Sequence, residues 1–134
     1  MVWRSITGAS AAEIEAMARA TLDGLPQHFS EHLGDILLQI EDYADEETLA
    51  AVGLTHPTQL SGIYEGIPLH LKSIDQSGTM PDRIRLFRGP ILMEWRERGD
   101  ITLERLVAHV TIHEVGHHFG LSDDDMHALE DAAE

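Results

Sequence analysis

The chain has 134 residues and no cysteine, and it carries a formal net charge of −15. Its hydrophobic fraction of 43% is ordinary for a globular protein, so we expect a single folded domain over residues 1–134 rather than a disordered chain. The negative charge argues against nucleic acid as a partner, and the lack of any apolar run of about 18 residues argues against a membrane span.

The first predicted element is a helix from Ser10 to Asp23. Ser10 and Glu13 have the spacing of a capping box, and apolar residues recur behind them at helical intervals. Gly24 is the expected stop. Residues 1–8, which precede the helix, lack the basic start and apolar run of a secretory signal, so we expect a cytoplasmic protein.

The next predicted element is a strand within Asp35–Tyr43. Ile36, Leu38 and Ile40 alternate with other residues, which is typical of a strand with one buried face. A short helix is expected over residues 45–52.

A hairpin is predicted over residues 62–69, followed by a strand over Arg83–Arg88. In that strand arginine alternates with Ile and Leu, which indicates a position near an edge of the sheet. Gly89 and Pro90 then open another short helix, since proline is well tolerated in a first helical turn.

The longest predicted helix starts at Asp100 or Thr102. Its apolar stripe runs through four residues at steps of three or four and continues into His113 and His117. We therefore expect the histidines to extend the buried face of the helix, in a partly dry setting where a metal ion acts strongly. The stripe consists of Leu103, Leu106, Val107 and Val110.

The sequence from His113 to Asp123 predicts a zinc site. His113 and His117 lie one helical turn apart on one face, where a single tetrahedral Zn²⁺ ion can accept both imidazoles. Glu114 lies about 100° around the helix, close enough to act on a metal-bound water without being a ligand. Gly120 permits a left-handed helix end, so that the chain reverses and brings Asp123 in as the third ligand.

Neighbouring residues have plainer explanations. A solvent-facing helix carboxylate is the alternative for Glu114, and a surface or supporting role is expected for His118. His109 is expected to be a core or rim histidine. Tyr64 is expected to be a half-buried aromatic residue rather than a donor to a developing oxyanion.

Over Pro81–Leu129 the chain resembles a bacterial family of minimal zincin-like metallopeptidases. The resemblance lies in the segment HEVGHHFGLSDDD and in the upstream segment RIRLFRGP. It implies a compact α+β domain, in which a small sheet of three or four strands packs against the long motif helix and the N-terminal helix. It also implies a zinc peptidase whose extended substrate lies along an edge strand beside the metal, here strand 83–88.

The sequence departs from the better-known zincin patterns at the third ligand. Metzincins have histidine where this chain has Asp123, and the position of Met126 leaves no room for their methionine turn. Asp123 matches a small branch of zincins that use aspartate. Asp124 or Asp125 takes its place if the turn runs differently, and Glu130 is the candidate under a gluzincin pattern.

Three functions from different classes fit this site. The first is a zinc metallopeptidase that hydrolyses peptide bonds with Glu114 as general base. The second is a non-catalytic module that holds a peptide or partner strand beside the metal, and the third is a structural metal site. Glu114 favours the first, because binding requires no base, whereas the small size of the chain favours the second.

Overall fold

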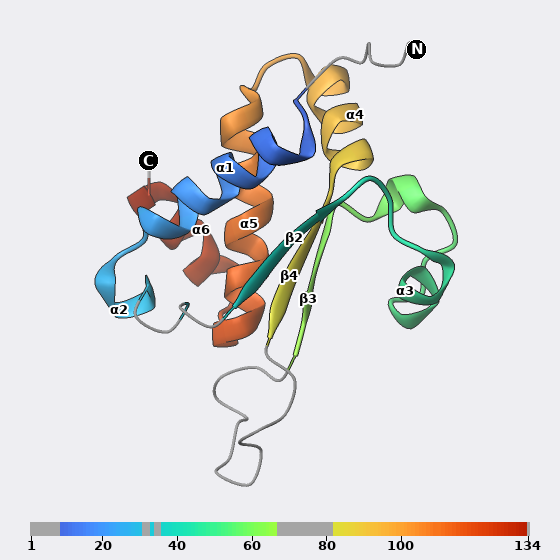
Figure 1. Ribbon diagram of the computed structural model, residues 1–134. Helices are drawn as coiled ribbons and strands as arrows, with labels where there is room; N and C mark the ends of the chain where they lie inside the picture. The colour runs from blue at the N-terminus through green and yellow to red at the C-terminus, as the bar shows by residue number, and fades with distance from the viewer. Residues whose placement is uncertain (1–8, 31–32, 34–35, 67–81, 134) are drawn as a thin grey trace, which may run out of the picture.

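The computed structural model describes residues 9–30, 33, 36–66 and 82–133 (Figure 1). The described segments contain helices interspersed with three strands of one sheet, which confirms the α+β class. The elements are α1 (Ala11–Asp23), α2 (Gln27–Ser30), β2 (Leu37–Glu41), α3 (Glu46–Ala51), the 3₁₀ turn η1 (Pro57–Gln59), β3 (Gly62–Glu65), β4 (Arg83–Phe87), α4 (Arg88–Arg98), α5 (Leu103–Phe119) and α6 (Asp123–Ala133).

The described part of the sheet has the strand order β2-β4-β3. Strand β2 runs parallel to β4, with Leu38 opposite Ile84, and β3 runs antiparallel to β4, with Tyr64 opposite Ile84. The second half of the predicted hairpin, residues 67–69, lies outside the described residues.

The prediction that Arg83–Arg88 forms an edge strand is wrong, because β4 is the central strand. Arg85 is only 5% exposed. Its guanidinium reaches carboxylates on both neighbouring strands, at 2.8 Å from Glu41 and 3.0 Å from Glu65. An arginine in an alternating strand usually marks a solvated face, but here the charges that neutralise it come from β2 and β3.

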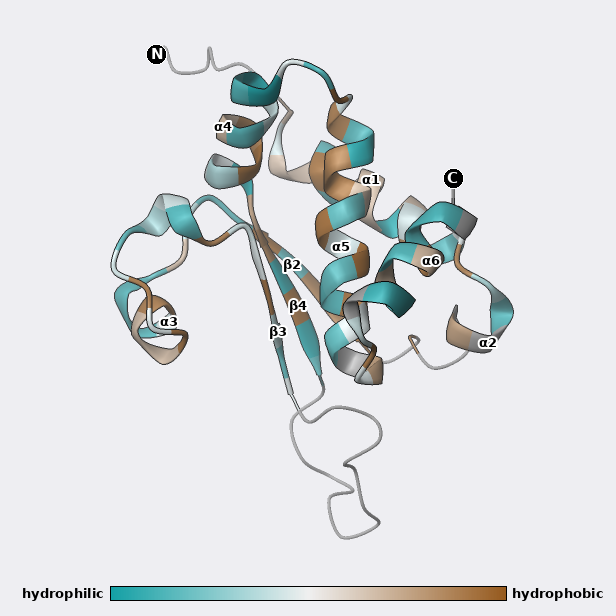
Figure 2. Cartoon of the chain, turned by 180° about the vertical axis from the view of Figure 1, so that it is seen from behind, coloured by the Kyte–Doolittle hydropathy of each residue, from teal (hydrophilic) through white to brown (hydrophobic). Residues whose placement is uncertain are grey.

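The helices α1 and α5 lie on one face of the sheet, and α3 lies on the other (Figure 1). Ile84 and Leu86 of β4 are fully buried in the core shared with α1 and α5. Phe87 is buried in a smaller cluster toward α3 with Leu49. The predicted apolar face of β2 is confirmed, since Ile36 is buried and Leu38 and Ile40 pack, partly buried, against the core shared with α1 and α5, whereas Leu37 is 47% exposed. Figure 2 shows the corresponding alternation of polar and apolar colour along the strands.

The helix boundaries follow local sequence signals. At α1, Ser10 and Glu13 make both hydrogen bonds of a capping box. At α5, the Thr102 side chain accepts a hydrogen bond from the Arg105 backbone N–H at 3.2 Å. Among the helices of the described residues, none has the length and apolar character needed to cross a membrane.

Candidate metal centre

The metal motif occupies the last two turns of α5 before the cap at Gly120. The prediction that His113 and His117 extend the buried stripe of this helix is wrong. The buried stripe continues instead through Thr111, Glu114 and Val115, while both histidines are exposed. At 3.6 residues per turn, Glu114 follows Val110 almost directly on the helix surface, so the histidines fall on the flank.

The two motif histidines lie close together. Their ring centroids are 5.0 Å apart, and their planes meet at 69°. Two imidazoles bound to one tetrahedral Zn²⁺ at about 2.1 Å have ring centres roughly 5 Å apart. The separation of the His113 and His117 rings is therefore compatible with a shared zinc ion.

Glu114 lies inside the protein, with 5% of its surface exposed, so the solvent-facing alternative for this residue is wrong. Its Oε1 atom has no hydrogen-bond partner among the described residues. The Nδ1 atom of His117 lies 3.1 Å away, within ion-pair distance but not in hydrogen-bonding geometry. A buried acceptor without a partner costs free energy, so it requires an explanation beyond packing.

The chain reverses directly after the motif, as predicted. Gly120 has the left-handed conformation, with φ 69° and ψ 33°, and the Leu121 N–H returns to the Gly116 carbonyl at 2.9 Å. The Ser122 side chain then caps α6 by accepting the Asp125 N–H at 3.2 Å. Asp123 is consequently the first residue of α6, in the segment that returns toward α5.

The side chains of Asp123 and His118 lie outside the described part of the structure. Within the described side chains, no three His, Asp or Glu groups come close enough together to share a metal ion. The structure therefore describes a close histidine pair on α5 followed by a backbone turn into α6, and both the bound metal and its third ligand stay predictions.

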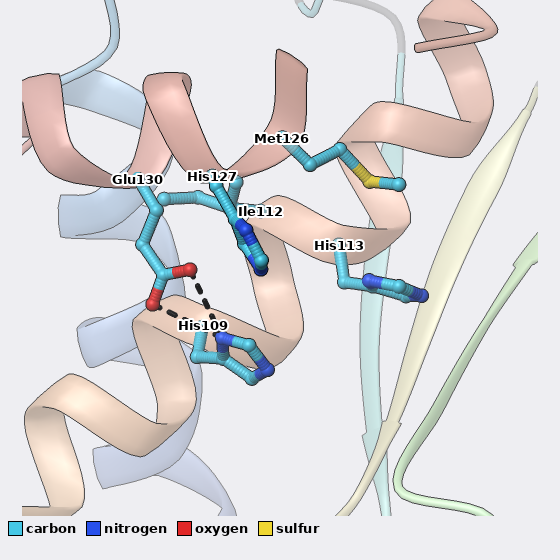
Figure 3. A pocket seen from close by; sticks show the side chains of 6 residues that line it. All are labelled: His109, Ile112, His113, Met126, His127 and Glu130. Atoms are coloured by element: carbon cyan, nitrogen blue, oxygen red, sulfur yellow. Dashed lines mark hydrogen bonds and ion pairs between the residues drawn. The ribbon is translucent and has the colours of Figure 1, made fainter. Parts of the chain in front are cut away.

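Helix α6 packs on α5 beside the motif (Figures 1 and 2). Met126 is buried, and its thioether lies against Gly116, where a Cβ atom would overlap the sulfur. A cavity of about 260 Å³ opens between the two helices and is seen in Figure 3. It is lined by His109, Ile112, His113, Met126, His127 and Glu130.

Glu130, the alternative third ligand, is paired with another histidine. Both carboxylate oxygens lie 3.0 Å from the Nδ1 atom of His109, one turn before His113 (Figure 3). His109 is exposed, which agrees with the predicted rim position. The sequence analysis did not predict this pair, because only the docking of α6 on α5 brings residues so distant in the chain together.

Tyr64 is half-buried on β3, as expected. Burial raises the pKa of its phenol well above the ordinary value, and the nearby Asp82 carboxylate, to which the phenol is hydrogen-bonded, raises that pKa further. Asp82 itself is buried. The phenol thus already forms a hydrogen bond with Asp82. This supports the interpretation of Tyr64 as a half-buried aromatic residue rather than a donor to an oxyanion.

Comparison with protein families places most of the chain in a known family. A family model described as zincin-like metallopeptidase matches residues 33–133. The matched region contains the whole sheet of the described residues together with α5 and α6. A comparison with curated proteins finds no match.

Proposed function

Because this chain belongs to the zincin-like metallopeptidase family, we propose that it is a zinc-dependent peptidase in which Glu114 is the general base. His113, His117 and Asp123 would hold the ion. Family membership supports zinc binding and a hydrolytic reaction in general. Support for the individual residues comes from the spacing of the two imidazoles and from the burial of Glu114.

The zinc ion, when bound, lowers the pKa of its water toward about 7 and polarises the substrate carbonyl. The chain supplies the proton transfer. Glu114 accepts a proton from the attacking water and delivers it to the leaving amine, so that one carboxyl group serves as base and then as acid. Burial keeps this carboxylate away from bulk water. In such a low-dielectric setting, its hydrogen bond to the reacting water is stronger than in solvent.

The buried carboxylate of Glu114, whose Oε1 has no hydrogen-bond partner among the described residues, is the observation that carries this proposal. A structural metal site or a strand-binding module has no use for a buried carboxylate acceptor beside its ligands. The non-catalytic module is therefore our second choice, and it becomes the first if zinc binds but no peptide is cleaved.

We propose that the substrate is an extended peptide and that it pairs with β3. The expected edge position of strand 83–88 is excluded by its central place in the sheet. Strand β3 is the outer strand of the sheet formed by the described residues. It packs on α5, and Val110 of α5 lies directly against Gly62 of β3. Pairing with a flanking strand supplies main-chain hydrogen bonds that suit many peptide sequences.

The deciding experiment is metal content by mass spectrometry on protein purified without chelator, for the wild type and His117→Ala together. About one zinc per chain in the wild type and its loss in the variant are expected, because a tetrahedral site needs both imidazoles. His127→Ala, which removes a histidine outside the motif, is the matched control and should keep the zinc. If the wild-type protein is purified without zinc and does not bind zinc when it is added, the proposal is contradicted.

A further inference from the structure

Helix α6 is held on α5 by the buried Leu129 and by two contacts at different levels of the helix pair. At the motif end, Met126 packs on Gly116. Farther along, Glu130 pairs with His109 at 3.0 Å. The order of the residues is reversed between the helices, so the two contacts lie about one to two helical turns apart along the pair. Two separated contacts fix the rotation of α6 as well as its distance from α5.

Position 123 is rigidly linked to both contacts. Asp123, Met126 and Glu130 are spaced by three and four residues, so their positions share one face of α6. A helix transmits rotation along its axis, because its backbone hydrogen bonds fix each residue relative to the next turn. The contact at Glu130 therefore influences the direction in which position 123 faces, over about 10 Å.

The pair between His109 and Glu130 is well placed for this role and poorly placed for direct ligation. Figure 3 shows both carboxylate oxygens directed at His109, while the side chain of His113 points away from the pair. Glu130 is 23% exposed and His109 is 46% exposed, so the pair is partly open to solvent and its role would be to align the two helices rather than to act as a strong ion pair.

We propose that His109 and Glu130 are positioning residues for the zinc site: by pairing, they hold α6 against α5 so that Asp123 reaches the metal. This inference rests on the proposed function, since it takes Asp123 as the third ligand. It also gives Glu130 a role distinct from direct ligation, the alternative that the sequence left open.

The experiment is a zinc-affinity cycle, measured by competition with a chelator of known affinity. Glu130→Ala should weaken zinc binding about 10- to 100-fold, as is usual for residues that orient ligands. Glu130→Gln, whose amide can still bond to His109, should restore most of the affinity. In an Asp123→Ala background, Glu130→Ala should have no further effect, because the residue acts through Asp123.

Controls separate the possible failures. Asp131→Ala removes a neighbouring negative charge and should leave zinc affinity unchanged. His109→Ala removes the other half of the pair and should reproduce the effect of Glu130→Ala, which keeps the test usable if one variant folds poorly. Thermal unfolding of the zinc-free proteins identifies any general loss of stability.

Two results would overturn the inference while leaving the metal site intact. One is unchanged zinc affinity in Glu130→Ala when His113→Ala abolishes binding. The other is a full effect of Glu130→Ala in the Asp123→Ala background, which would make Glu130 itself a ligand. By contrast, unchanged zinc binding in His113→Ala would refute the proposed metal site rather than the positioning role.

Discussion

Met126 lays its thioether against the backbone of Gly116, in the space that a side chain at position 116 would fill. The contact joins α6 to the middle of the HEVGHH segment, between the two motif histidines in sequence. A glycine inside a helix costs about 1 kcal/mol relative to alanine, so its presence here calls for a packing reason. The close approach of Met126 supplies that reason.

Gly116→Ala should therefore destabilise the protein despite the better helix propensity of alanine. The added Cβ atom would overlap the sulfur of Met126, and such overpacking costs about 1–3 kcal/mol. Urea unfolding of the zinc-free protein measures the change. Adding Met126→Ala in the same chain should relieve the overlap, so the two effects should not add. If Gly116→Ala alone were more stable than the wild type, α6 would have to move away from α5 at little cost, which would contradict this prediction.

Glu114→Gln should separate metal binding from hydrolysis. The amide is nearly isosteric with the carboxylate and leaves both imidazole ligands in place, so the variant should still bind zinc. Cleavage should fall at least about 100-fold, because the amide cannot accept the proton from water. A peptide-library assay followed by mass spectrometry gives both the rate and the cleavage position. Wild-type activity in this variant would refute the assignment of the base.

Tyr64 should remain protonated well above the ordinary range of tyrosine. Its pKa is raised by burial and by Asp82, so the Tyr43→Phe variant, which retains only Tyr64, should show little phenolate absorbance at pH 10. A raised pKa means that the contribution of Tyr64 to stability is complete below the unfolded value of 10.0 and is lost at higher pH. If the Tyr64 phenol of the folded variant were half-ionised at pH 10, its pKa would not be raised by burial and Asp82, and the prediction would be wrong.

Local signals in the sequence predicted the helices of the site well. The cap at Ser10, the start of α5 after Thr102 and the left-handed Gly120 each depend on neighbouring residues alone. The spacing of His113 and His117 is likewise a local property of a helix. These predictions were confirmed because nothing distant competes with the local preference.

The errors have the opposite origin. Arg83–Arg88 looked like an edge strand because the sequence of one strand does not reveal that Glu41 and Glu65 stand on either side. The sequence analysis placed His113 on the buried face of α5 because it follows Val110 by three residues. Glu114 follows Val110 by four residues, and both spacings fit one face of a helix. Only the packing of β3 and β4 on α5 decides that Glu114, rather than His113, faces inward.

The buried guanidinium of Arg85 offers a test of the sheet that is separate from the metal. Hydrogen bonding to Glu41 raises the pKa of Arg85, so the residue stays charged inside the fold, and its Nη1 also donates to the buried Thr48 hydroxyl at 2.9 Å. Arg85→Met should remove these bonds and leave Glu41 without its pair with Arg85, while Glu65 keeps its pair with Arg83. The expected loss is about 2–4 kcal/mol in the free energy of unfolding.

Arg83→Met is the matched control on the same strand and the same face of the sheet. Its side chain is 38% exposed, so the loss of its pair with Glu65 should cost less than about 1 kcal/mol. Both variants should bind zinc like the wild type, because α5 covers the opposite face of the sheet. Equal destabilisation by the two substitutions, measured by urea unfolding, would show that burial of Arg85 does not determine the strength of this network.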